Sequence, residues 1–195
     1  MKQEYKCHFE ETKFINEKNL EYKNKCDFNN RPDTEPYRKF YDNHLFRYSL
    51  KCKIKKKGKS ITVILMNPSY ADEYGLDSTL CNTRDFLEKN TDFSEFEVLN
   101  IFPIRTPNSK HLLSLMTKNS EIQKENDKYI KEVLSKSNDV LIAWGGKYHH
   151  KATWIFEFLK GKNVYTYSVN KDYTPRHFAP QAYNRTEKKL QKYRF

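Results

Sequence analysis

Beyond residue 44, short apolar runs alternate with longer segments in which apolar side chains recur every three or four positions. The short runs predict strands, and the longer segments predict helices that bury one face. The expected strands are residues 44–54, 61–66, 95–102, 139–145 and 163–169, and the expected helices are residues 77–90, 120–137 and 147–161. The first two strands flank a basic turn at residues 55–60, which favours a β-hairpin.

The order of these elements indicates the fold class. Because strands alternate with helices from residue 61 onward, we expect an α/β three-layer sandwich with a central, mostly parallel sheet. Residues 1–43 are polar and weakly periodic, and they contain the breaker cluster NNRPDTEPY. We therefore expect an N-terminal arm of short elements at residues 1–43, packed on a domain that spans residues 44–195.

Charge and cysteine content narrow the class of function. The chain has 36 Lys and Arg against 25 Asp and Glu, a net charge of +11. This excess favours a nucleic acid as partner, although a solvated basic surface would also account for it. The four cysteines are too far apart for a zinc or iron–sulfur motif, so we expect reduced thiols and neither metal nor cofactor. The polar N-terminus and the lack of a run of about 20 apolar residues indicate a cytoplasmic protein without membrane contact.

Polar residues follow directly after the predicted strands, and ligands of parallel α/β sheets bind at that edge. Asn67-Pro68-Ser69-Tyr70 follows the strand at 61–66, Asn100 lies near the end of the strand at 95–102, and a late loop contains His177. The same edge carries the basic side chains Arg105, Lys110, His111, Lys147 and Arg176. A neutral polar pocket within a cationic rim suits an uncharged base on an anionic backbone.

Four segments in this order resemble the uracil-DNA glycosylase superfamily. Asn67-Pro68-Ser69 is similar to its first motif, and VLNIFPIRTPNSKH (98–111) is similar to its strand that ends in Asn. LIAWGGKYHHKATW (141–154) resembles its Trp-Gly segment, and PRHFAP (175–180) keeps the His and a later Pro of its second motif. The chain also resembles a bacterial family of uncharacterised domains with an LNPS…AWG…PRH pattern. The resemblance covers residues 61–185 and implies a uracil-DNA-glycosylase-like fold.

The resemblance implies roles for three residues, each with a plainer alternative. Asn67 would hold the attacking water through its side-chain carbonyl, or else form an Asx turn. Asn100 would read uracil, accepting from N3–H and donating to O4, or else cap the strand end. His177 would donate to O2 of the departing base, or else bind phosphate from a surface loop beside Arg176.

Further residues receive supporting roles. Pro68, Ser69, Tyr70 and Phe86 are expected to shape the base pocket. The basic residues Arg105, Lys110, His111, Lys147 and Arg176 are expected to contact phosphates, and Phe178 is expected to contact the DNA. Phe178, Gln181 and Tyr183 are the candidates to fill the base stack after the target base flips out.

We therefore predict a monofunctional uracil-DNA glycosylase, a hydrolase of base excision repair that acts as a monomer on single- or double-stranded DNA. Two departures keep other functions open: Ser69 stands in place of a Gly, and the second motif lacks a Ser and a Pro. The alternatives are a glycosylase-like nucleic-acid-binding protein without catalysis and a glycosylase for another damaged or mismatched base.

Overall fold

The computed structural model describes residues 12–15 and 46–195, except residues 70, 72–75, 107–108 and 186. Of the predicted arm, only β1 (Thr12–Ile15) is described; the rest of residues 1–43 lies outside the described residues. The described chain forms a seven-stranded sheet in the order β1-β2-β4-β3-β5-β6-β7. Its other strands are β2 (Phe46–Lys53), β3 (Lys59–Leu65), β4 (Phe93–Asn100), β5 (Asp139–Ile142), β6 (Asn163–Thr166) and β7 (Gln191–Lys192).

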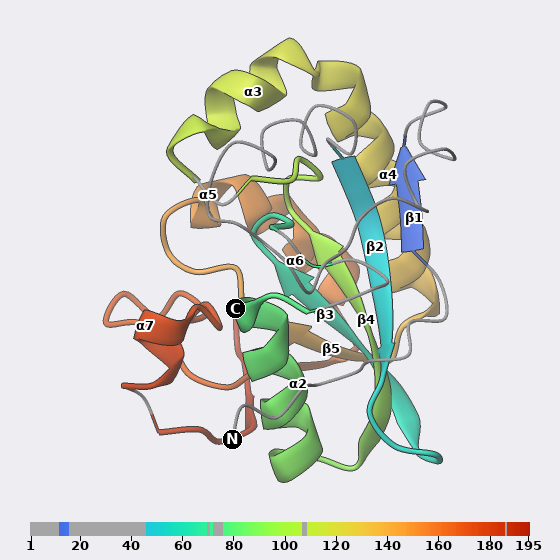
Figure 1. Ribbon diagram of the computed structural model, residues 1–195, viewed down its shortest axis with the longest axis vertical. Helices are drawn as coiled ribbons and strands as arrows, with labels where there is room; N and C mark the ends of the chain where they lie inside the picture. Colours follow the sequence, from blue (N-terminus) through green and yellow to red (C-terminus); the bar gives the residue numbers. More distant parts are fainter. Residues whose placement is uncertain (1–11, 16–45, 70, 72–75, 107–108, 186) are drawn as a thin grey trace, which may run out of the picture.

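Helices lie on both sides of this sheet (Figure 1). On one side, α2 (Ser78–Asn90) and α7 (Pro180–Tyr183) contribute Leu80, Phe86 and Tyr183 to a core with Val63 and other sheet residues. We call this side of the sheet the α2 face. On the other side, α3 (Leu112–Lys118), α4 (Ser120–Lys136), α5 (His149–Ala152), η3 (Thr153–Ile155) and α6 (Phe156–Leu159) cover a second core; a short turn, η2 (Ser109–His111), precedes α3. The fold is therefore a mixed α/β structure with one core on each face of the sheet.

The prediction of a mostly parallel sheet is wrong. In the described chain, β4, β3, β5 and β6 pair in parallel, whereas the β1–β2, β2–β4 and β6–β7 pairs are antiparallel. The parallel part is the centre of the sheet, where crossover helices connect the strands. The antiparallel strands lie at its two margins, where the local sequence gives no sign of direction.

The predicted hairpin is also wrong, because β4 lies between β2 and β3. The loop after β2 therefore crosses the start of β4, and the Ile54 and Lys55 amides both donate to the Ser94 carbonyl, at 2.6 and 3.0 Å. Gly58 has a φ of +151°, and a Cβ there would lie 2.7 Å from the Asp92 carbonyl oxygen. The turn predicted at residues 55–60 thus reverses the chain over an intervening strand.

The predicted helices form with one exception. The α2 helix begins where expected, with Asp77 as N-cap accepting from the Leu80 amide at 3.0 Å. The helix predicted at residues 147–161 is divided into α5, η3 and α6. Its centre reads Thr-Trp-Ile-Phe, β-branched and aromatic residues that are weak helix formers. In the part of the chain that is described, no helix combines the length and the apolar character that a membrane span requires.

Candidate functional site

The carboxyl ends of β3 and β4 lie side by side, and the loops that follow them stay together. Leu65 pairs with Asn100 in the last register position. Beyond it, the Ile101 amide donates to the Leu65 carbonyl at 3.0 Å, and the Thr106 amide donates to the Pro68 carbonyl at 3.0 Å. The segments that carry Asn67 and Asn100 therefore form one edge, as expected for neighbouring parallel strands.

Asn67 connects these two loops through its amide group. Its Nδ2 donates to the Pro68 carbonyl at 2.8 Å and to the Thr106 carbonyl at 2.7 Å. Because two carbonyl oxygens fix which amide atom is the nitrogen, Oδ1 is directed away from them as an acceptor. This pattern differs from the Asx turn that was the alternative for Asn67, since there Oδ1 would accept from a nearby backbone amide.

Asn100 is fully buried at the end of β4, and neither Nδ2 nor Oδ1 has a hydrogen-bond partner among the described residues. Since its register partner Leu65 packs in the core with α2, the Asn100 side chain points to the α2 face. A buried amide without partners costs about 1–3 kcal/mol for each unpaired group. Within the part of the chain that is described, the Asn100 side chain bonds to no backbone group, which argues against the alternative that it caps the strand end.

His177 lies in the loop between β6 and α7, partly buried. Its Nδ1 accepts from the Ala179 amide at 3.0 Å, which leaves the proton of the neutral ring on Nε2. Burial lowers the pKa of His177 to about 4, while the Asp77 carboxylate opposes this effect. At neutral pH the ring is therefore uncharged and presents Nε2–H as a donor.

The Trp144–Gly145 segment joins His177 to the rest of the edge. The Gly145 amide donates to the Pro175 carbonyl at 2.9 Å, and the Ala143 amide donates to Ile64 of β3 at 2.9 Å. Gly145 has a φ of +80°, and a Cβ there would lie 3.4 Å from the His177 Cβ. The backbone thus brings Asn67, Asn100 and His177 to one edge, although the three side chains form no hydrogen bonds with each other.

Arg105 does not have the role that its sequence position indicated. Only 2% of it is exposed, and it donates to the Ser69 carbonyl at 3.2 Å and to the Ala71 carbonyl at 3.4 Å. Buried Arg47 also donates to the Ala71 carbonyl. The prediction that Arg105 contacts phosphate is therefore replaced by a role in holding the Pro68–Ala71 loop.

Two aromatic predictions are corrected as well. Phe86 and Phe178 are both fully buried and pack against each other at 5.6 Å between ring centroids. Phe178 also stacks on Tyr167 at 4.2 Å. Because neither ring has exposed surface, Phe86 does not line an open base pocket and Phe178 does not contact DNA in this structure; both belong to the core with α2.

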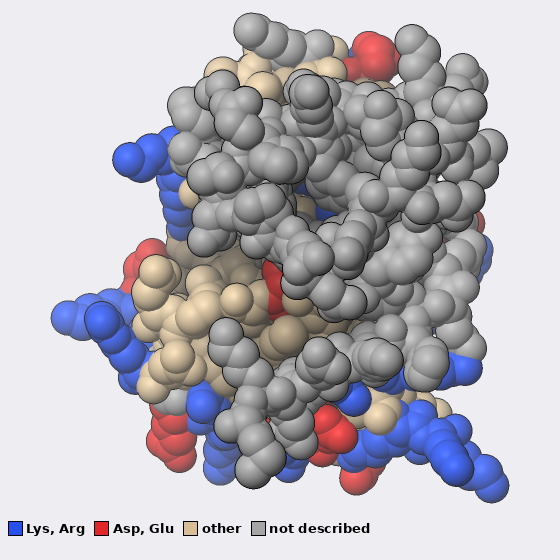
Figure 2. Space-filling model, viewed as in Figure 1, with Lys and Arg blue, Asp and Glu red and all other residues tan. Residues whose placement is uncertain are grey.

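The remaining predicted site residues range from buried to exposed. Pro68 is buried and Ser69 is partly buried in the loop after β3, whereas Tyr70 and the side chain of His111 lie outside the described residues. Lys110 and Lys147 are exposed, with Lys147 Nζ donating to Ser109 Oγ at 3.1 Å, and Arg176 is partly exposed. In Figure 2 the described surface near α7 is largely uncharged, and Lys and Arg side chains flank it with some acids between them.

Two supporting residues were not anticipated. Asn126 of α4 is fully buried and donates from Nδ2 to the Asn100 and Ile101 carbonyls, at 2.9 and 3.2 Å. Its signal in the sequence is a polar residue on the apolar stripe between Ile122 and Ile130. Arg47 is the other, and nothing in the sequence of β2 distinguishes it from a solvated strand residue.

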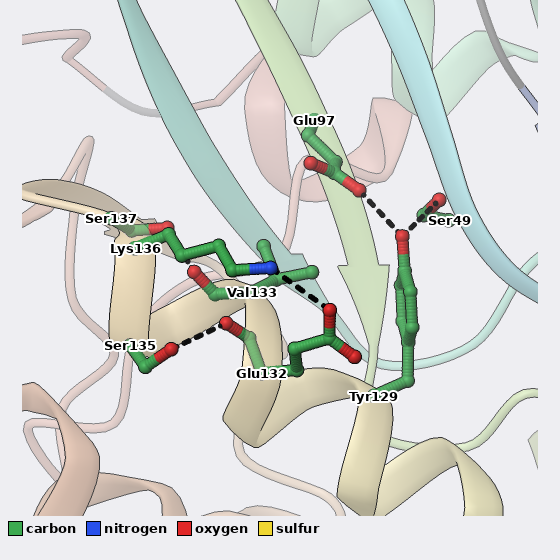
Figure 3. A network of polar contacts seen from close by, with 8 residues as sticks. All are labelled: Ser49, Glu97, Tyr129, Glu132, Val133, Ser135, Lys136 and Ser137. Atoms are coloured by element: carbon green, nitrogen blue, oxygen red, sulfur yellow. Dashed lines mark hydrogen bonds and ion pairs between the residues drawn. The ribbon is translucent and has the colours of Figure 1, made fainter.

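A large hollow of about 920 Å³ lies at the opposite, amino end of the central strands. Its acidic and basic side chains balance; they are Lys51, Lys53, Lys59, Lys136, Glu95, Glu97, Glu132 and Asp139. Its polar groups bond to one another, as Figure 3 shows for Tyr129, whose hydroxyl donates to Glu97 at 3.0 Å, and for Lys136 with Glu132 at 2.9 Å. Polar groups that already bond to each other gain little from a ligand, whereas the buried amide of Asn100 would gain two hydrogen bonds from one. The carboxyl edge is therefore the better candidate site.

The described residues contain no group of three or more His, Cys, Asp or Glu side chains placed to hold a metal ion. The groups that this edge presents are the amide acceptor of Asn67, the buried amide of Asn100 and the neutral imidazole of His177.

Comparison with known proteins places this edge within one family. Neither a curated protein nor a solved structure matches the chain. Residues 47–178, more than half of the chain, match the family described as "Protein of unknown function (DUF1643)". The matched segment contains Asn67, Asn100 and His177 together with Arg47 and Asn126. The chain therefore belongs to the DUF1643 family.

Proposed function

We propose that this protein is a uracil-DNA glycosylase that hydrolyses the N-glycosidic bond of a flipped-out uracil and leaves an abasic site. The observation that carries the proposal is Asn100, a fully buried amide whose donor and acceptor both lack a partner among the described residues. A uracil ring has the matching pair, N3–H as donor and O4 as acceptor. Bound uracil would thus satisfy both groups at once, whereas cytosine would satisfy neither with the amide in the same orientation.

The other two residues supply the chemical step. Departure of the base leaves cationic character on the sugar and negative charge on the base. The Nε2–H of neutral His177 donates to O2 of the departing base, as a donor of an oxyanion hole does. The Oδ1 of Asn67 accepts from the attacking water, and because an amide is a poor general base, we expect slower catalysis than a carboxylate would support.

The direct test is incubation of excess protein with a uracil-containing oligonucleotide, followed by alkali cleavage at abasic sites. We expect cleavage at the uracil position without added metal. An oligonucleotide that stays intact after prolonged incubation would exclude the glycosylase proposal.

Asn100→Asp tests base reading within the same assay. A carboxylate accepts from N3–H of uracil or from the amino group of cytosine, but it cannot donate to O4. We expect the single-turnover preference for uracil over cytosine to fall. An unchanged preference would mean that Asn100 does not face the base.

A DNA-binding protein without catalysis is the second candidate. The observation that favours it is that the residue proposed to hold the water is Asn67 rather than a carboxylate, and that its amide nitrogen already connects two loops. Tight binding of uracil-containing DNA without release of uracil would select this alternative.

A further inference from the structure

Tyr173 stands at the tip of a turn that immediately precedes the His177 loop. Its side chain is 79% exposed, which is unusual for a large aromatic residue. Its φ is +62°, and it is the one non-glycine residue of the described chain with a left-handed backbone. A bulky residue in this region is strained, and such strain persists where surrounding structure enforces it.

Hydrogen bonds on both sides enforce this conformation. The Tyr173 amide donates to the Asn170 carbonyl at 3.0 Å, and the Asn170 amide donates to the Thr174 carbonyl at 2.9 Å. Asp172 accepts from the Thr174 amide at 3.2 Å and from its hydroxyl at 2.7 Å. From the C-terminal segment, the Tyr193 hydroxyl donates to the Tyr173 carbonyl at 3.0 Å. The backbone under the exposed ring is thus fixed before any ligand binds.

The turn also packs against the candidate site. A Cβ at Gly146 would lie 3.0 Å from Thr174 Oγ1, so the turn rests directly on this glycine. The neighbouring Gly145 donates to Pro175 and approaches His177. A ligand that binds at the Tyr173 turn therefore lies near His177.

The charges around the turn favour a polyanion. Lys171 is exposed within the turn, and exposed Lys147 is next to Gly146 in the chain. The one acid of the turn, Asp172, accepts hydrogen bonds from Thr174. An exposed aromatic ring between lysines has the composition of a stacking site for single-stranded nucleic acid.

We propose that Tyr173 stacks on a base of single-stranded DNA that neighbours the base bound at the candidate site. The inference rests on the proposed function, and it specifies the form of the substrate. Of the three candidates for filling an emptied duplex stack, Phe178 and Tyr183 are buried at 0% and 3% exposure, and the exposed one, Gln181, has no aromatic ring. A single strand has no stack to refill, and it offers its bases to an exposed ring without unpairing.

The test compares Tyr173→Gly and Tyr173→Phe in the full chain. Glycine removes the ring and adopts the left-handed backbone without strain, so the fold is retained and the melting temperature is not lowered. Binding is measured by fluorescence anisotropy with a labelled single-stranded oligonucleotide that carries one 2′-fluoro-deoxyuridine, whose fluorine prevents cleavage. We expect Tyr173→Gly to bind about 5- to 150-fold more weakly, the usual loss for one stacked base. Tyr173→Phe keeps the ring and should bind within about twofold of the wild type.

Salt dependence separates stacking from charge. Tyr173→Gly should leave the slope of log affinity against log salt unchanged, whereas Lys171→Ala should reduce its magnitude by about 0.7, the value for one phosphate contact on a single strand. A change of slope in Tyr173→Gly would contradict stacking.

Other outcomes overturn the inference in distinguishable ways. If Tyr173→Gly binds the single strand as the wild type does, Tyr173 does not stack, and excision of uracil by the wild type would leave the proposed function intact. If only binding to duplex DNA is weakened, the assignment to single strands is wrong. If the wild type neither binds DNA nor releases uracil, the proposed function fails and this inference fails with it.

Discussion

His177 presents one hydrogen-bond donor from an uncharged ring. If it stabilises the departing base, His177→Ala should reduce the single-turnover rate on uracil DNA by about 10²- to 10³-fold, the usual loss for one oxyanion donor. Affinity for uncleavable DNA should change little, because phosphate contacts supply most of the binding. His177→Asn keeps a side-chain donor and should recover part of the rate. Equal rates for the wild type and the alanine variant would remove His177 from the mechanism.

The same residue predicts a dependence of stability on pH. Burial places the pKa of His177 at about 4 in the folded protein, against an ordinary value of 6.5. Between these two values the unfolded chain binds more protons than the folded one, so stability falls as pH is lowered from 6.5 towards 4. Above pH 6.5, His177 no longer makes the free energy of unfolding depend on pH. Urea midpoints at pH 7.5 and pH 4.5 should therefore differ more for the wild type than for His177→Asn. Equal differences would contradict the lowered pKa.

The sequence singled out Asn67, Asn100 and His177 because polar residues at strand ends are conspicuous after apolar runs. It could not show their partners, which decide between the proposed role and the plainer alternative. Asn67 bonds to Thr106, 39 positions away, and the side-chain amide of Asn100 has no hydrogen-bond partner among the described residues. It also failed for Arg105 and Phe178. An arginine in a loop and an aromatic ring beside a histidine look like surface residues until their burial is known.

The end of β4 is supported from the face opposite to the Asn100 side chain. Asn126 of α4 donates to the Asn100 and Ile101 carbonyls, and Gln123 of α4 donates to the Ile101 carbonyl at 2.9 Å. Asn126→Leu removes a donor from buried carbonyls, so we expect a loss of about 1–3 kcal/mol in the free energy of unfolding. Urea titration measures this loss.

Lys128→Leu is the matched control for Asn126→Leu, because Lys128 is exposed on the same helix and its replacement should change stability by no more than about 0.5 kcal/mol. If Asn126→Leu is as stable as this control, α4 does not support the end of β4.

Local sequence specified most elements but not their arrangement. The period of apolar residues located α2, α4 and the central strands, and Asp77 marked the start of α2. Strand order depends on pairing between segments that are distant in the sequence. The position of β4 between β2 and β3 could therefore not be predicted from the local sequence. The segment that forms α5, η3 and α6 is apolar enough to be buried, but its β-branched and aromatic residues are weak helix formers, so it does not form one regular helix.

The net charge of +11 applies to the whole chain, but its effect on DNA binding should be local. Affinity for single-stranded DNA should fall with salt, with a slope of about −0.7 for each phosphate contact. Lys147→Ala should reduce the slope by one such contact, because Lys147 is exposed beside the site. Arg105→Gln should leave the slope unchanged, because Arg105 is buried and bonds to backbone carbonyls.

Lys53→Ala, at the amino end of the sheet, should also leave the slope unchanged. Anisotropy titrations over a series of salt concentrations measure all three variants. A reduced slope for Arg105→Gln would show that Arg105 contacts phosphate despite its burial.

The buried amide of Asn100 should lower the stability of the protein. Among the described residues its two side-chain polar groups have no hydrogen-bond partner, so an apolar residue of similar size should be more stable at this position. We expect Asn100→Leu to raise the free energy of unfolding by about 1–3 kcal/mol while abolishing base recognition. A thermal melt of this variant checks the first expectation. A more stable variant would mean that asparagine at this position lowers the stability of the protein, as is expected of a residue that is retained to bind a ligand.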